Sequence, residues 1–152
     1  LEPTFREYSS KVVENSKALA SYLRSKGYRL VSDGTDNHLM LVDLRDVVPD
    51  NTGKEVAFWL EKAGIIANHN GIPKDPRPPM QTSGIRLGTP AVTTRNMGLK
   101  EMDKIADWID RVIVSKGILK CMRKLKMRFP NFVQIFLFHI SYRVHNLINI
   151  VP

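Results

Sequence analysis

The chain has 152 residues, enough for one domain with a real core, and its 43% hydrophobic and 25% charged residues are typical of a globular protein. A single cysteine, Cys121, excludes an internal disulfide framework and favours a reducing compartment. The net charge of +8 does not indicate a basic domain, because all 15 acidic residues lie at or before Asp110 and are balanced there by basic ones.

The first predicted element is an amphipathic helix over residues 5–26, in which apolar side chains recur at three- and four-residue steps. The chain enters it almost directly from Leu1, with neither an initiator methionine nor a signal peptide, so we expect a cytoplasmic part of a longer protein. Gly27 predicts the end of the helix. Residues 28–32 and 38–44 then predict two strands that pair as a hairpin around an Asp-Gly turn.

A capping box over residues 52–55 predicts the start of a second helix, and Gly64 predicts its end. A short strand is expected over residues 65–68. Four prolines exclude helix from the loop at residues 71–79. Another short strand is expected over residues 85–87.

Residues 99–112 predict a last amphipathic helix, with charged side chains on its outer face. The order helix, hairpin, helix, strand, loop, strand, helix predicts an α/β (α+β) two-layer sandwich, in which a small, mostly antiparallel sheet has helices on one face. We expect this domain to span residues 1–113. An atypical tail, basic and then apolar, is expected over residues 114–152.

The chemistry of the chain concentrates in residues 83–95, Ser-Gly-Ile-Arg-Leu-Gly-Thr-Pro-Ala-Val-Thr-Thr-Arg. Here Arg86 sits in a short apolar strand between Gly84 and Gly88. Flanking glycines permit a close approach of the backbone or a sharp bend. A guanidinium held there offers a rigid fork of donors for a carboxylate or a phosphate. From the residues alone, a structural ion pair is an equally good interpretation of Arg86.

Four stretches of the sequence, in order and spacing, resemble the C-terminal domain of serine hydroxymethyltransferase. They are Leu-Glu-Pro with the helix that follows it (residues 1–3), Val-Ser-Asp-Gly-Thr-Asp-Asn-His-Leu (31–39), Asn-His-Asn-Gly-Ile-Pro (68–73) and the stretch at 83–95. Residues 80–82 look more like bacterial members. The resemblance runs from residue 1 to about residue 113 and is specific, because four stretches match in register.

The resemblance implies the C-terminal domain of a fold-type I enzyme that depends on pyridoxal phosphate. The family moves a one-carbon unit between serine and tetrahydrofolate and yields glycine, a transferase reaction of one-carbon metabolism. The cofactor is the electron sink for the carbanion, while the protein supplies orientation and electrostatics. The family's active sites form between two subunits, so a homodimer is expected of the full-length enzyme. No nucleic-acid or membrane partner is expected.

Within this resemblance Arg86 looks like the arginine that binds the α-carboxylate of serine or glycine. A bidentate clamp would decide which bond at Cα stands perpendicular to the cofactor ring, and hence which bond breaks. Asn70 matches the asparagine that lies against the folate, since its amide can donate and accept at once. The alternative for Asn70 is a loop asparagine that stabilises its own turn.

Other polar residues are expected to be structural. Asn68 and Thr94 are expected to have structural roles. The same is expected of His38, because a lone histidine entering an apolar strand is usually a hydrogen-bonded structural residue. Arg95 is expected either to support the site or to anchor its own turn. The four histidines show no metal-ligand spacing with Cys121, so no metal site is predicted.

The sequence also departs from the family. No Thr-Thr-His-Lys run occurs, so the lysine that forms the Schiff base is missing and no catalytic residue is predicted in this chain. We expect the isolated chain to be inactive. Asp33 and Asn96 stand where glycine is usual, and both residue types tolerate left-handed backbone geometry. His69 replaces the usual lysine or arginine.

The tail departs most. Residues 128–132 resemble the family's ending, but residues 132–152 have no family counterpart, and an altered gene end is the preferred interpretation over a basic segment on a membrane surface. Two alternatives to an enzyme part remain. One is a non-catalytic remnant or interaction module. The other, a membrane- or nucleic-acid-binding protein, ranks last because the basic run 116–128 has no aromatic residue.

Overall fold

The computed structural model describes residues 2–118, so predictions for residues 119–152 fall outside the described residues. The helices and strands, in chain order, are α1 (Pro3–Ser25), β1 (Arg29–Leu30), the 3₁₀ turn η1 (Val31–Asp33), β2 (Leu39–Asp43), α2 (Gly53–Lys62), β3 (Asn68–Asn70), β4 (Gly84–Gly88), α3 (Pro90–Thr93) and α4 (Leu99–Val114). Every predicted helix and the predicted hairpin are present, within one or two residues at most ends.

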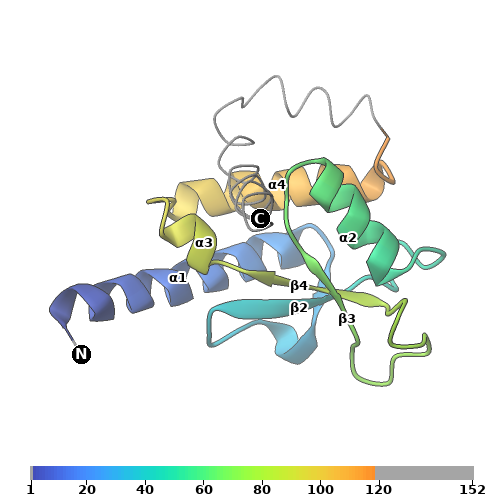
Figure 1. Cartoon of the computed structure of the whole chain (residues 1–152), viewed down its shortest axis with the longest axis horizontal. Helices are drawn as coiled ribbons and strands as arrows, with labels where there is room; N and C mark the ends of the chain where they lie inside the picture. The colour runs from blue at the N-terminus through green and yellow to red at the C-terminus, as the bar shows by residue number, and fades with distance from the viewer. Residues whose placement is uncertain (1, 119–152) are drawn as a thin grey trace, which may run out of the picture.

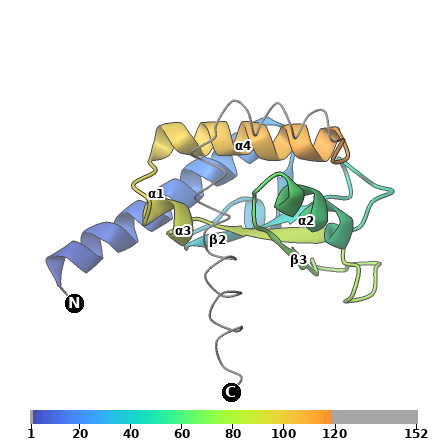
Figure 2. The same cartoon turned by 45° about the horizontal axis from the view of Figure 1, so that its top comes forward.

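The sheet has the order β1-β2-β4-β3, and each neighbouring pair is antiparallel. The long helices α1, α2 and α4 lie together on one side of it, with α4 farthest from the strands (Figures 1 and 2). The predicted two-layer α/β fold is therefore confirmed. The first turns of α1 project past the rest of the body, and residues 2–7 are exposed (Figure 1).

The core lies between the sheet and the helices. Strand side chains alternate between the two faces, and the helix-facing set, Met40 and Val42 from β2 with Ile85 and Leu87 from β4, is at most 4% exposed. The helices add a stripe of apolar side chains with helical spacing, among them Leu19, Leu23, Val56, Leu60, Met102, Ile105, Ile109 and Val112. Burial of this stripe fixes the helices on the sheet.

Local signals explain most element ends. Thr52 Oγ1 accepts a hydrogen bond from Glu55 N, and Glu55 Oε2 accepts one from Thr52 N, which completes the predicted capping box. Gly27, with φ +91°, follows α1 directly after its C-cap residue. Asp33 and Asn96, the substitutes for glycine, both adopt left-handed geometry with φ of 55° and 57°.

The strand predicted over residues 65–68 is wrong in position. Ile65 N donates to Leu60 O at 2.8 Å and so completes the end of α2. The strand begins only at Asn68, where β4 offers a partner in register, Asn68 with Arg86 and Asn70 with Gly84. Of the apolar residues before it, Ile65 and Ala67 pack against the core without joining the sheet, while Ile66 is exposed. The short helix α3, with Pro90 in its first turn, was not predicted.

Gly53 brings α2 unusually close to the start of β4. A Cβ at Gly53 would lie 2.2 Å from Gly84 O and 2.5 Å from Thr82 Oγ1, so a side chain cannot be added without moving backbone. We expect Gly53→Ala to lower the free energy of unfolding in urea by about 1–3 kcal/mol.

Gly71→Ala is the matched control for Gly53→Ala. Its added methyl would have Asp75 Oδ2 as the nearest atom, at 4.0 Å, so no loss of stability is expected. Equal stabilities of Gly53→Ala and the unsubstituted chain would contradict the close contact.

Candidate functional site

Arg86 lies in the centre of the sheet face that the helices leave uncovered. Its neighbours Ile85 and Leu87 are buried under the helices, so the alternation of β4 directs Arg86 to the opposite face. Directly across from it stand Leu41 of β2 and Asn68 of β3. Arg86 is exposed, and its side chain has no hydrogen-bond or ion-pair partner within residues 2–118.

A shallow depression of about 330 Å³ surrounds Arg86. It is lined by His38, Leu39, Ile66, Asn68, Arg86, Leu87 and Gly88. Gly88 adds no side chain to this wall, which leaves the guanidinium accessible. The fold thus brings Arg86, Asn68 and His38 together, and the last two had been expected to be structural. The depression can hold a small anion through the guanidinium, which offers two parallel N–H donors to a carboxylate.

Asn70 lies nearby but in a different depression. It pairs with Gly84, two residues before Arg86, and its Nδ2 donates to Gly71 O at 3.0 Å. The second depression, of about 500 Å³, is lined by His69, Asn70, Gly71, Asp75, Arg77, Pro79 and Thr82. The carboxamide therefore stabilises its own turn through one N–H, and neither depression contains both Asn70 and Arg86.

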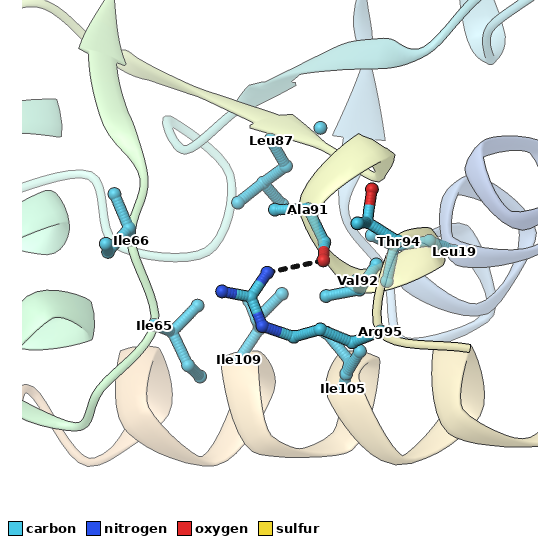
Figure 3. A pocket seen from close by; sticks show the side chains of 11 residues that line it. Leu19, Ile65, Ile66, Leu87, Ala91, Val92, Thr94, Arg95, Ile105 and Ile109 are labelled. Carbon is cyan, nitrogen blue, oxygen red and sulfur yellow. Dashed lines mark hydrogen bonds between the residues drawn. The ribbon is translucent and has the colours of Figure 1, made fainter. Parts of the chain in front are cut away.

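Arg95 and Thr94 line a different pocket from Arg86, although the two pockets share Ile66, Leu87 and Gly88. They line an apolar pocket of about 650 Å³ with Leu19, Ile65, Ile66, Leu87, Gly88, Ala91, Val92, Ile105 and Ile109. In Figure 3 the Arg95 side chain crosses this pocket toward the carbonyl oxygen of Ala91, to which Nη1 donates at 2.5 Å. Thr94 Oγ1 donates to Pro90 O at 2.9 Å and lies 3.0 Å from the Tyr8 hydroxyl.

Two threonines of the 83–95 stretch bind α1, a role that the sequence analysis missed. Thr89 Oγ1 donates to Val12 O at 2.8 Å, and both groups are buried. Asn15 Nδ2 donates to Thr93 Oγ1 at 2.9 Å and to Met97 O at 2.9 Å. These bonds tie the end of β4 and the following helix to α1. The partners are separated by 77 to 82 residues, so no local sequence signal could have revealed them.

A charged cluster lies at one end of the open face, where Asp43 of β2 pairs in register with Arg29 and Gly84. The Asp43 carboxylate, 4% exposed, accepts from Arg45 Nη2 at 2.8 Å and also pairs with Arg29. Burial alone would raise the pKa of Asp43. Hydrogen bonds from the side chain and backbone of Arg45 and from Arg29 outweigh burial and hold that pKa below its usual value.

Two further kinds of site are absent from residues 2–118. No group of three His, Cys, Asp or Glu side chains in this part of the chain is arranged to hold a metal ion. None of its helices combines the length and the apolar character that crossing a bilayer requires.

Comparison with known proteins points to one family. The family model described as "Serine hydroxymethyltransferase" matches residues 1–109. A curated protein named serine hydroxymethyltransferase, from Acinetobacter baylyi, is 47% identical over 128 residues. That alignment covers 84% of this chain but 30% of the relative, so the chain spans about a third of the relative's length. The family match ends four residues before the domain boundary predicted from the sequence.

The Asp43 cluster predicts how stability changes in acid. Since the pKa of Asp43 is lower in the folded chain than its ordinary 3.8, its stabilising contribution is complete above that value and is lost as the pH falls through the folded pKa. We expect Asp43→Asn to be less stable at neutral pH and to lose less stability than the unsubstituted chain between about pH 5 and pH 3 in urea unfolding.

Asp46→Asn is the control for Asp43→Asn, because this carboxylate also pairs with Arg29 but its side chain is 60% exposed. It should keep the acid dependence of the unsubstituted chain. If the free energy of unfolding falls equally with pH in Asp43→Asn and in the unsubstituted chain, Asp43 is not the source of the acid dependence.

Proposed function

We propose that this chain, which belongs to the serine hydroxymethyltransferase family, supplies the arginine that binds the α-carboxylate of serine or glycine in the complete enzyme. Arg86 is that residue. The observation that supports it is a guanidinium without a partner among the described residues, in a depression on the open face of the sheet. A structural arginine would be expected to hold an internal partner, as Arg29 and Arg45 do with Asp43.

The geometry around Arg86 suits a carboxylate. β4 is paired on both sides, so its backbone is rigid and Arg86 is presented from a fixed point. Leu41 on one side and Leu39 nearby make part of the surroundings apolar, which strengthens a charged hydrogen bond once water is excluded. A two-point grip on the carboxylate leaves the amino acid little freedom about Cα, and that orientation is the contribution of this chain.

The cofactor would be held elsewhere. Pyridoxal phosphate, when bound, supplies the electron sink for a carbanion at Cα. It needs a lysine for its Schiff base, and neither depression on the open face has a lysine in its lining. The depression around Arg86 therefore fits the substrate's carboxylate, and neither depression offers the lysine that the cofactor needs. We infer that the isolated chain is inactive and that further polypeptide, in a homodimer, completes the site.

Asn70 is proposed to contact the folate co-substrate. One of its N–H groups is taken by Gly71 O, which leaves the second N–H and the carbonyl oxygen for a ligand. That pair can donate and accept on one edge of a pterin ring. The transferase reaction proposed for the complete enzyme is serine plus tetrahydrofolate to glycine plus methylenetetrahydrofolate.

A hybrid enzyme tests the role of Arg86. In it, the full 152-residue chain replaces the matching segment of the Acinetobacter baylyi relative. Arg86→Lys keeps the charge but loses the fork, so we expect kcat/KM for serine to fall about 10- to 100-fold.

Arg111→Lys on α4 is the matched control, because Arg111 pairs with Asp107 in the helix layer. It should leave the kinetics of the hybrid unchanged. Full activity of Arg86→Lys would contradict the proposal that Arg86 binds the substrate's carboxylate. Failure of the unsubstituted hybrid to turn over serine, despite folding, would favour the non-catalytic module.

The isolated chain tests the inference of inactivity. Mixed with pyridoxal phosphate, it should give no lasting absorbance of a Schiff base, because no lysine lines either depression on the open face. A stable yellow species that survives gel filtration would contradict this expectation.

A further inference from the structure

Asp75 is the carboxylate around which the loop between β3 and β4 is organised. Its Oδ2 accepts from Ser83 N at 2.8 Å and from Ile72 N at 3.3 Å, while its Oδ1 accepts from Arg77 N at 3.0 Å. Ile72 stands at the beginning of the loop and Ser83 at its end, directly before β4. One side chain thus joins the two ends of the loop.

The loop is braced from two further directions. Arg77 Nη2 donates to Pro49 O at 2.6 Å, and Nη1 donates to Ser83 Oγ at 3.3 Å. From the N-terminus of α2, Gly53 N donates to Thr82 O at 2.9 Å and Lys54 N to Gln81 O at 3.1 Å. Together these bonds fix the loop between α2 and β4.

These hydrogen bonds hold the backbone of Thr82 in a conformation that a threonine rarely adopts. It has φ +54°, which is unfavourable for a β-branched residue, yet it is only 3% exposed. Such strain persists only where the surroundings over-determine the conformation, and it is typical of functional sites. Thr82 and Asp75 both line the depression that contains Asn70.

None of these loop hydrogen bonds involves Arg86. Ile72 packs over Gly84, where a Cβ would lie 2.5 Å from Ile72 Cγ2, so the loop closes over the first residue of β4. Arg86, two residues on, is held by pairing with Leu41 and Asn68 and lines the other depression. The loop can therefore change the surroundings of Asn70 while the strand keeps Arg86 in place.

We propose that Asp75 is a positioning residue that holds one wall of the Asn70 depression, and so sets the affinity for the folate co-substrate without changing the grip on the amino acid. This inference rests on the proposed function, because it takes Asn70 as the folate contact. The hydrogen bonds to Asp75 also hold the pKa of its carboxyl below the usual value despite partial burial, which keeps it ionised at neutral pH.

The test uses Asp75→Asn in the hybrid enzyme described above and in the unmodified 152-residue chain. The amide keeps the size but cannot accept three N–H bonds as well as a carboxylate does. In the hybrid we expect KM for tetrahydrofolate to rise about 10-fold, while KM for serine changes less than about 2-fold. In the chain alone, amide hydrogen exchange at Ser83 should be about 10-fold faster by NMR.

Two variants accompany Asp75→Asn. Asp50→Asn removes an exposed charge of a neighbouring loop and should change neither KM. Asp75→Glu keeps the charge but moves the carboxylate by one methylene. It should raise KM for tetrahydrofolate at least about 2-fold while KM for serine again changes less than about 2-fold. If Asp75→Asn does not fold, Asp75→Glu provides the test in its place.

The possible outcomes distinguish the positioning role of Asp75 from the folate contact of Asn70 on which it rests. Equal rises in both KM values would show a merely structural role and overturn the proposal. If Asn70→Ala raises KM for tetrahydrofolate but neither Asp75 variant does, the folate role of Asn70 holds and the role of Asp75 is rejected. If neither Asn70→Ala nor the Asp75 variants raise it, the folate contact itself is wrong, and the inference falls with it.

Discussion

The structure depends on the pairing of β4 between β2 and β3. Because side chains alternate along a strand, one register puts Ile85 and Leu87 into the core and Arg86 on the open face. A shift of one residue would bury the guanidinium and expose two apolar side chains. The hydrophobic core therefore enforces the position of the charge, and the stability of the domain and the accessibility of Arg86 have the same origin.

Both ends of β4 are held by polar contacts that the core does not supply. At its start, Asp75 and the N-terminus of α2 fix the backbone of residues 81–83. At its end, Thr89 and Thr93 bind α1 through buried hydrogen bonds. A buried donor or acceptor without a partner is costly, so each of these groups specifies one arrangement of the chain. Much of the 83–95 stretch thus serves the placement of a single arginine.

Charge is distributed unevenly over the open face, and this affects what can bind there. At one end, Asp43 pairs with Arg29 and Arg45, and Asp46 also pairs with Arg29, so these two arginines are occupied. Arg86 makes no ion pair with that cluster and has no such partner among residues 2–118. A small carboxylate approaching this face would therefore meet one available guanidinium beside polar Asn68 and His38. This arrangement supports the proposal that the face binds a single carboxylate.

Periodicity and capping signals in the sequence determined the three long helices, the hairpin and the two-layer class, because local apolar spacing and turn chemistry act over a few residues. The resemblance placed Arg86 and Asn70 in a family, and their roles stay predictions. Tertiary structure alone decided the true bounds of β3, the placement of Asn70 and Arg86 in two neighbouring depressions, and the positions of Arg95, Asp75 and Thr89. The bounds of β3 and the bond of Thr89 to α1 rest on contacts between distant segments. Arg95 and Asp75 bond residues two to eight positions away. None of these contacts leaves a periodic trace in the residues that make it.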